Sequence, residues 1–219
     1  DIKGIIHFAA HKYVGESVEQ PLKYYKNNLL SLINIIELAK EFNVNNFVFS
    51  SSCTVYGQPD KLPVSEDAPI QKTCSPYGNT KKVAEEIISD YCSQNKDFNT
   101  VLLRYFNPIG AHSSGLIGEL PIGVPSNLMP FITQTAFGIR KQLSVFGNDY
   151  NTPDGTAIRD YIHVVDLANA HVKALERMMF ENDNQNLEIY NIGTGNGLSV
   201  LEVINAFVKE NNLNFPFVF

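Results

Sequence analysis

Cysteine is scarce in this sequence, and its few cysteines are not spaced for bonding. Three occur among 219 residues, an odd number without paired metal spacing: Cys53, Cys74 and Cys92. This pattern indicates a reducing compartment and predicts neither a disulfide framework nor a zinc site. The five histidines also show no ligand spacing, so no metal site is expected.

Long apolar runs and runs of positive charge are absent as well. The most apolar segment, residues 29–39, is interrupted by three polar residues, whereas a membrane-spanning helix needs about 20 apolar residues. The 17 lysines and arginines are outnumbered by 23 aspartates and glutamates, which gives a formal net charge of −6. Nucleic-acid binding depends on cations that neutralise phosphates, so we expect neither a membrane protein nor a nucleic-acid-binding protein.

The start of the chain lacks two common signals. It opens on Asp1–Gly4 rather than on a methionine, and these residues do not form a signal peptide. The residues that follow already have the pattern of a strand. We therefore expect a cytoplasmic protein, seen as a fragment whose N-terminal part is missing.

Short apolar runs alternate with longer segments of helical spacing in the first half of the chain. The predicted elements are, in order, a strand at 4–10, a helix at 22–42, a strand at 47–50, a helix at 77–94 and a strand at 100–105. This alternation is typical of an α/β fold with a parallel sheet.

The chain changes character after residue 107. Residues 108–127 are rich in glycine and proline, and we expect an irregular loop there. Ser199 is expected to cap the last helix, with Glu202 at the capping-box position. The predicted elements are a helix at 128–140, strands at 143–146 and 161–164, a helix at 166–180, a strand at 188–192 and a helix that ends near 209.

Tyr77 and Lys81 form the pair most suggestive of chemistry. Four residues are about one helical turn, so both side chains lie on one face of the predicted helix. A lysine ammonium near a phenol favours the phenolate and lowers the pKa of the phenol, which would make Tyr77 a general base. The spacing also arises by chance, and the alternative is a half-buried tyrosine beside a solvated lysine.

Three serines, Ser50–Ser52, end a predicted buried strand upstream of Tyr77. Ligands of parallel α/β sheets bind beyond the carboxyl ends of the strands. A serine hydroxyl there can form a hydrogen bond with a substrate oxygen as its proton moves. The alternative, a polar strand end that satisfies its own backbone, suits Ser50 and Ser51.

A strand-end serine followed by Tyr-x-x-x-Lys resembles the extended short-chain dehydrogenase/reductase superfamily. Over nearly the whole chain, further segments resemble its UDP-glucose 4-epimerase family. These segments are His7–Ala10, Val14–Ser17, Tyr24–Asn28, Ser50–Gly57, Ser75–Gly78, Leu103–His112, Asn127–Pro130, Phe146–Tyr150, Asp154–Thr156 and Arg159–Val164. The resemblance implies a doubly wound, Rossmann-like parallel sheet, incomplete at its N-terminus, with a smaller mixed α/β substrate domain. We expect residues 1–106 to belong to the NAD-binding domain, and 107–219 mainly to a truncated UDP-sugar domain that is partly interleaved with the first.

The resemblance also implies roles for individual residues. Ser52 would bind the sugar's 4-hydroxyl, Tyr77 would be the base, and Lys81 would be its partner and hold the nicotinamide ribose. Other cofactor contacts would come from Phe8, Ala9, Lys12, Asn27 and Tyr105. Other substrate contacts would come from Lys12, Phe106, Asn107, Asn127, Leu128, Phe146 and Arg159.

Two of these substrate residues have chemistry that suits a nucleoside diphosphate. An arginine such as Arg159 can grip phosphate oxygens in a bidentate manner, and an aromatic ring such as Phe146 can line a wall beside uracil. The alternatives are a salt bridge between Arg159 and Asp160, and a core position for Phe146.

The activity implied by the resemblance is isomerase chemistry in galactose metabolism: UDP-glucose and UDP-galactose would be interconverted with NAD as the cofactor. Epimerases of UDP-glucuronate or UDP-N-acetylhexosamine remain alternatives. A 4,6-dehydratase is disfavoured because its strand-end carboxylates are replaced here by Cys53 and Thr54, and a non-catalytic member is disfavoured because Tyr77 and Lys81 both remain. The resemblance further implies a homodimer that pairs through helices 22–42 and 77–94.

One part of the family pattern is missing. No Gly-x-Gly-x-x-Gly turn follows the first strand, and the stretch Gly193–Gly197 is interpreted as a strand-to-helix turn rather than as a substitute. Whether the chain is active by itself is therefore left open.

Overall fold

Residues 2–180 and 185–219 are described by a computed structural model, in which the chain divides into two units. The first unit comprises residues 1–106 and 167–192, and the second comprises 107–166 and 193–219. The chain thus leaves the first unit after Phe106 and returns to it before the second unit is complete. Among the described residues, no helix is long and apolar enough to cross a membrane.

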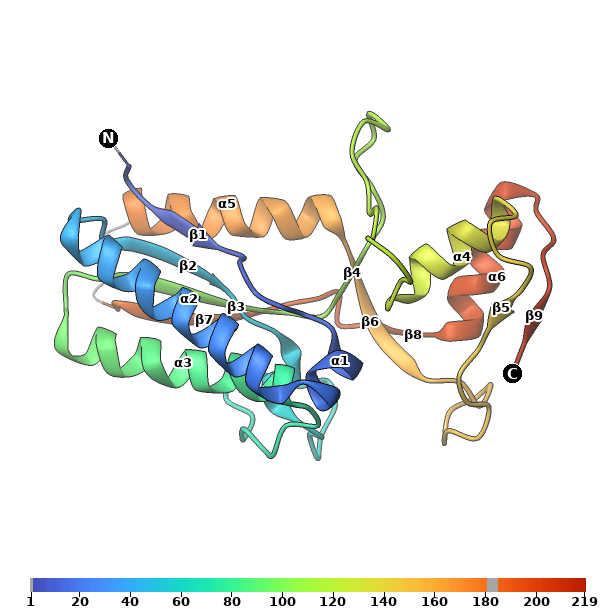
Figure 1. Ribbon diagram of the computed structural model, residues 1–219, viewed down its shortest axis with the longest axis horizontal. Coiled ribbons are helices and arrows are strands. Elements are labelled where there is room, and N and C mark those ends of the chain that lie inside the picture. Colours follow the sequence, from blue (N-terminus) through green and yellow to red (C-terminus); the bar gives the residue numbers. More distant parts are fainter. Residues whose placement is uncertain (1, 181–184) are drawn as a thin grey trace. The chain divides into compact units, whose positions relative to one another are not determined.

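A four-stranded sheet in the order β1-β2-β3-β7 forms the centre of the first unit, and all of its strands are parallel (Figure 1). The strands are β1 (Ile5–His7), β2 (Asn46–Ser50), β3 (Asn99–Tyr105) and β7 (Leu187–Ile192). The helices are α1 (Val14–Glu19), α2 (Pro21–Glu41), α3 (Pro76–Gln94) and α5 (Val164–Phe180), with a 3₁₀ turn at Cys53–Tyr56. The α/β fold with a parallel sheet is confirmed.

Alternation along the strands sends side chains to two separate cores. On one face, Phe47, Phe49 and Leu102 pack with residues of α2 and α3. On the other face, Val48, Val101 and Leu103 pack with Ala174 of α5. Helices therefore cover both faces of the sheet, as Figure 1 shows with α5 opposite α2 and α3. This is the doubly wound arrangement.

The second unit contains two small sheets and two helices. The first sheet has the order β4-β6-β8, and the second pairs β5 with β9. Its apolar core includes Ile132, Leu143 and Ile204. The elements are β4 (Asn107–Ile109), α4 (Leu128–Ala136), β5 (Leu143–Ser144), β6 (Ile158–His163), β8 (Gly197–Ser199), α6 (Val200–Asn211) and β9 (Phe217–Val218).

The sequence predicted the long elements well and the short ones poorly. The capping box of Ser199 and Glu202 at the start of α6 is confirmed. The helix predicted at 128–140 is wrong at its end, because Gly138 adopts a positive φ that terminates α4 early. Five short elements were not predicted from the sequence, because each is too short to show a period: α1, the 3₁₀ turn, β4, β8 and β9.

Candidate functional site

The carboxyl ends of β1, β2 and β3 lie together because the three strands are adjacent and parallel. The chain leaves these strands at Phe8, Ser51 and Phe106. Ligands of parallel α/β sheets bind at this edge. It is here that most of the site residues expected in the first unit are found.

The three serines at the end of β2 bind three different partners. Alternation continues past the strand, so Ser50 faces α5 and Ser51 faces α3. The Ser50 hydroxyl lies 2.7 Å from Nε2 of His171, and the Ser51 hydroxyl donates to the carboxylate of Glu85. The suggestion that Ser50 and Ser51 satisfy their own backbone is therefore wrong, since both side chains bind groups on distant helices.

Ser52 is turned toward Tyr77. Its Oγ accepts hydrogen bonds from the backbone N–H of Thr54 at 3.3 Å and from the Thr54 hydroxyl at 3.0 Å. With these acceptor positions filled, the Ser52 proton remains available as a donor, and this hydroxyl acts to lower the pKa of the nearby Tyr77 phenol. A donor aimed at the phenol oxygen stabilises the phenolate form.

Helix α3 begins where it does because of two local signals. Ser75 caps it by accepting from the N–H of Gly78 at 3.1 Å, and Pro76 occupies the first turn. Gly78 allows this turn to approach the 3₁₀ turn, since a Cβ there would lie 3.3 Å from both Cβ and the carbonyl oxygen of Thr54. The close approach brings Tyr77 next to the serines.

Tyr77 and Lys81 are both buried, at 8% and 4% exposure. The Lys81 ammonium donates to the carbonyl oxygen of Ser50 at 2.6 Å and lies 4.7 Å from the ring centre of Phe49. The alternative of a half-buried tyrosine beside a solvated lysine therefore does not describe this pair.

The pKa of Tyr77 is shifted in the opposite direction to the one expected from the sequence. Burial raises the pKa of this phenol above its usual value, nearby Tyr105 adds to the increase, and the Ser52 hydroxyl opposes it. The expected lowering of the phenol's pKa is wrong, because desolvation of a buried phenolate outweighs its stabilisation.

Burial has the opposite effect on Lys81. It lowers the pKa of the ammonium from 10.5 to about 8, while the Glu85 carboxylate acts to raise it. Because the folded-state pKa lies below the unfolded-state value, the unfolded chain binds more protons between about pH 8 and pH 10.5. Stability contributed by this group therefore rises with pH across that window.

We expect Lys81→Met to be at least as stable as the parent at pH 7, although it removes a hydrogen bond. A methionine avoids the cost of burying the ammonium, which amounts to about 3 kcal/mol at most for a shift of this size. Urea unfolding at pH 7 and pH 10 measures the effect, and the difference between variant and parent should shrink at the higher pH. Strong destabilisation at pH 7 would show that the lysine's contacts outweigh its desolvation.

His171 of α5 completes the polar layer beneath the serines. Its Nδ1 lies 2.8 Å from the carbonyl oxygen of Leu167, to which it donates, so Nε2 accepts from Ser50. Burial lowers the pKa of this imidazole, which favours the neutral form. Tyr105 lies near the same serine, whose hydroxyl acts to lower the pKa of the Tyr105 phenol. His171 was not assigned to the site from the sequence.

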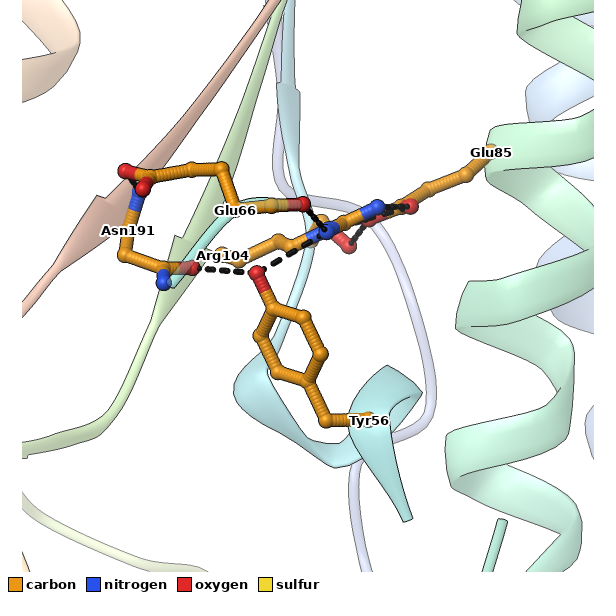
Figure 2. Close-up of polar contacts among 6 residues, drawn as sticks. Tyr56, Glu66, Glu85, Arg104 and Asn191 are labelled. Carbon is orange, nitrogen blue, oxygen red and sulfur yellow. Dashed lines mark hydrogen bonds and ion pairs between the residues drawn. The ribbon is translucent and has the colours of Figure 1, made fainter. Parts of the chain in front are cut away.

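A buried charge network lies on the α3 side of the same serines and was also missed. Arg104 of β3 binds the Glu85 carboxylate through Nε at 3.0 and 3.2 Å and through Nη2 at 2.6 Å. Its Nη1 donates to the Tyr56 hydroxyl at 2.9 Å and to the Glu66 carbonyl oxygen at 3.3 Å. Tyr56 donates in turn to Asn191 at 2.7 Å. Figure 2 shows Arg104 between Glu85 on one side and Tyr56 and Glu66 on the other.

The residues of the first unit fit one end of a dinucleotide. Buried Ser52, Tyr77 and Lys81 offer hydroxyl and ammonium groups at the strand ends, and the exposed ring of Phe8 lies 4.6 Å from the ring of His171. Ala9, Lys12 and Asn27 are exposed, and Asn27 donates to the side chain of Asn28 at 3.1 Å. This donor set fits a nicotinamide riboside. Among the described residues, no group of three His, Cys, Asp or Glu side chains could hold a metal ion.

The glycine-containing stretch Gly193–Gly197 does not offer a phosphate cradle. Both carboxylate oxygens of Asp160 accept from the N–H of Thr194, at 2.9 and 3.0 Å, and the N–H of Gly195 donates to one of them at 2.8 Å. These donors are already engaged. The stretch joins β7 to β8 and α6 as a turn.

The second unit holds five of the expected substrate residues, whereas Phe106 belongs to the first. Asn107 donates from its side chain to the carbonyl oxygen of Asp160 at 3.0 Å, and Asn127 donates to Glu119 at 3.1 Å. Leu128 is partly buried at the start of α4. Phe146 and Arg159 are exposed. The roles of all five stay predictions.

The structural alternatives for Phe146 and Arg159 do not hold. Phe146 is 81% exposed, so it is not a core residue. Asp160 is occupied by Thr194 and Gly195, and Arg159 donates to its own neighbour's carbonyl oxygen, that of Ile158, at 2.8 Å. Within residues 2–180 and 185–219, no carboxylate forms an ion pair with Arg159. Both side chains are therefore available to a ligand.

Comparisons with known proteins agree with the resemblance inferred from the sequence. Residues 1–193 match the model of the NAD dependent epimerase/dehydratase family. The UDP-glucose 4-epimerase of Haemophilus influenzae is 52% identical over 99% of this chain and 63% of its own length. The human UDP-glucose 4-epimerase is 52% identical over 97% of this chain and 60% of its own length. The chain thus spans less than two thirds of these relatives.

A solved structure also matches this chain closely. The UDP-glucose 4-epimerase of Bifidobacterium longum, solved in complex with NAD+ and UDP, superposes with a TM-score of 0.94 at 48% identity. The superposition covers the whole of this chain and 64% of that one. The Rossmann-like fold is confirmed by this match.

Proposed function

Because the chain belongs to the NAD dependent epimerase/dehydratase family, we propose that it carries the catalytic part of an NAD-dependent UDP-glucose 4-epimerase. The substrates would be UDP-glucose and UDP-galactose. The observation that carries the proposal is the buried group of Ser52, Tyr77 and Lys81 at the carboxyl ends of the parallel strands. The similarity to UDP-glucose 4-epimerases at about half of all positions supports the same substrate pair.

The chain's residues would manage the proton at O4 of the hexose. NAD+, when bound, would supply the hydride acceptor and donor for C4 of the hexose. Tyr77 would take the O4 proton on oxidation and give it back on reduction. Ser52 would donate its hydroxyl proton to O4 of the sugar, and Lys81 would hold a ribose hydroxyl and supply positive charge nearby. Burial of the three groups excludes water, which strengthens these interactions.

The two units would divide the ligands between them. We propose that the first unit holds the cofactor through Phe8, Ala9, Lys12, Asn27 and Tyr105. The second unit, with Phe106 of the first, would hold the UDP-sugar. The UDP-sugar contacts in the second unit would be Asn107, Asn127, Leu128, Phe146 and Arg159, and Lys12 of the first unit would contribute as well.

We also propose a cytoplasmic homodimer that acts in galactose metabolism. Pairing would involve α2 and α3, and the half-exposed Leu30 and Leu38 of α2 support an apolar interface there. The spacing and scarcity of cysteine support a reducing compartment.

An isotope experiment on the full-length protein tests the reaction. UDP-galactose carrying deuterium at C4 should give UDP-glucose that retains the deuterium at C4, because the same hydride leaves and returns. A 4,6-dehydratase would instead release water and form a 4-keto-6-deoxy sugar. Parallel incubations with UDP-N-acetylglucosamine and UDP-glucuronate distinguish the other epimerases. Loss of deuterium to solvent would contradict the proposed route.

We expect Arg159→Gln to weaken UDP binding about tenfold or more, because a charged hydrogen bond to phosphate is worth about 1.5–3 kcal/mol. Isothermal titration of UDP into the full-length protein measures the change. Arg140→Gln is a suitable control, since that guanidinium lies over the Phe131 ring and donates to Gln134 at 2.7 Å. Equal affinity in the Arg159 variant and the control would remove Arg159 from the UDP site.

A further inference from the structure

Helix α3 packs against the serine segment at three successive turns. Tyr77, Lys81 and Glu85 are spaced four residues apart and therefore share one face. The first turn approaches Thr54, two residues after Ser52, at Gly78; Lys81 donates to the Ser50 carbonyl oxygen at 2.6 Å, and Glu85 accepts from the Ser51 hydroxyl. Ser50 and Ser51 are thus held by two successive turns of the helix, and its first turn, with Tyr77, lies next to Ser52.

The contact through Glu85 is anchored from the sheet as well. Arg104 lies on β3 on the same face as Leu102, which packs against α3, and it binds both oxygens of Glu85. The Arg104 and Glu85 side chains are only 5% and 9% exposed. The guanidinium's third nitrogen is bound to Tyr56 and Glu66, so it cannot turn without breaking bonds. Glu85 is therefore held in one orientation.

We propose that Glu85, held by Arg104, is a positioning residue that fixes Ser52 beside Tyr77. The proposal rests on the proposed function, since it assumes that Tyr77 is the base. Ser51 lies one peptide bond from Ser52, so a shift of Ser51 moves the Ser52 hydroxyl away from the phenol. Misplacement of a reacting group by about 1 Å can cost on the order of 100-fold in rate.

Glu85 also contributes the negative charge near Lys81. The groups that interact with the ammonium are Phe49 and Ser50 from β2, Glu85 from its own helix and His7 from β1, and Tyr77 lies one helical turn before it. Burial and then the Lys81 charge lower the pKa of His7 to about 4, so this histidine is neutral at pH 7. The Glu85 carboxylate raises the pKa of Lys81 against the effect of burial. Removal of its charge should therefore let Lys81 lose its proton at a lower pH.

The test compares Glu85→Gln with Glu188→Gln in the full-length protein. Glu188 pairs with Arg177 at 2.8 Å near the opposite end of the sheet, so its variant controls for the loss of a partly buried ion pair. We expect Glu85→Gln to lower kcat roughly 10- to 100-fold while KM for the UDP-sugar stays within about threefold. We also expect the pKa of Lys81, followed through its ammonium signal in ¹⁵N NMR, to be lower in Glu85→Gln than in Glu188→Gln. The Lys81→Met variant, which lacks this signal, serves to assign it. The NMR titration needs neither substrate nor turnover.

Ser51→Ala provides a milder second variant that keeps the ion pair intact. It should lower kcat about fivefold or more without raising KM, because only the contact to Ser51 is lost. If Glu85→Gln fails to fold, this variant decides the question. Normal kcat in Ser51→Ala, or a rise in KM instead of a fall in kcat, would overturn the positioning role. Full turnover in Tyr77→Phe would instead overturn the proposed function, which keeps the two failures distinct.

Discussion

Tyr77→Phe is expected to bind UDP as the parent protein does and to lose roughly 100-fold or more in turnover, the usual scale for a lost acid–base group. The substitution removes one hydroxyl and keeps the ring, so the packing of the 8%-exposed side chain should persist. The Ser52 hydroxyl could not take over the proton, because the side chain bonded to it, the Thr54 hydroxyl, is not a general base. Turnover of UDP-galactose and titration of UDP measure the two quantities separately.

Tyr91→Phe is the matched control for this experiment. Tyr91 lies on the same helix and packs edge-on against Phe98 with ring centres 5.0 Å apart. In the part of the chain that the structure describes, its hydroxyl has no hydrogen-bond partner. We expect its kcat to stay within about twofold of the parent. A Tyr77→Phe protein that turns over like this control would exclude Tyr77 as the base.

The site residues that the sequence revealed are those whose spacing carries information by itself. Tyr77 and Lys81 are one turn apart, and Ser52 follows a short apolar run, so helix and strand periodicity are enough to bring them to one edge of the sheet. The structure adds that all three are buried. Long elements such as α2 and α3 were predictable for the same reason, since several turns of apolar spacing define them.

Glu85, Arg104 and His171 did not stand out because their partners lie far away in the chain. Arg104 and Glu85 are 19 residues apart, and Ser50 and His171 are 121 apart. The sequence nevertheless contains a signal for the pairing of Glu85 with Arg104. Glu85 continues the four-residue spacing of Tyr77 and Lys81, and Arg104 shares its strand face with Leu102. A charged residue on each of two faces that pack together predicts a buried pair.

The direction of the Tyr77 pKa shift was not predictable from spacing, because removal of water from the buried phenol is the largest effect on it. Spacing shows that Lys81 is one turn away but not how deeply the phenol is buried. Burial depends on how closely α3 packs on the 3₁₀ turn, and it holds Tyr77 as a neutral phenol.

Arg104→Met is expected to lower the free energy of unfolding by about 3–5 kcal/mol, the usual cost of removing one partner from a buried ion pair. The methionine fills much of the same space, but the Glu85 carboxylate would stay buried without its cation. The Tyr56 hydroxyl and the Glu66 carbonyl oxygen would also lose a donor. Urea unfolding at pH 7 measures the loss. Lys173→Met is the control, because its ion pair with Glu176 is exposed to water and should contribute little to stability.

A double variant separates the uncompensated charge from the lost packing. Glu85→Gln added to Arg104→Met removes the buried negative charge while the side chain keeps its size. If the charge dominates, the double variant should be more stable than Arg104→Met alone by about 1–3 kcal/mol, a coupling typical of residues in direct contact. If the decreases in the free energy of unfolding caused by the two single substitutions simply add, the destabilisation by Arg104→Met comes from lost packing and from the lost contacts to Tyr56 and Glu66. An Arg104→Met protein as stable as Lys173→Met would show that the pair does not hold α3 to the sheet, and the positioning of Ser52 would then need another source.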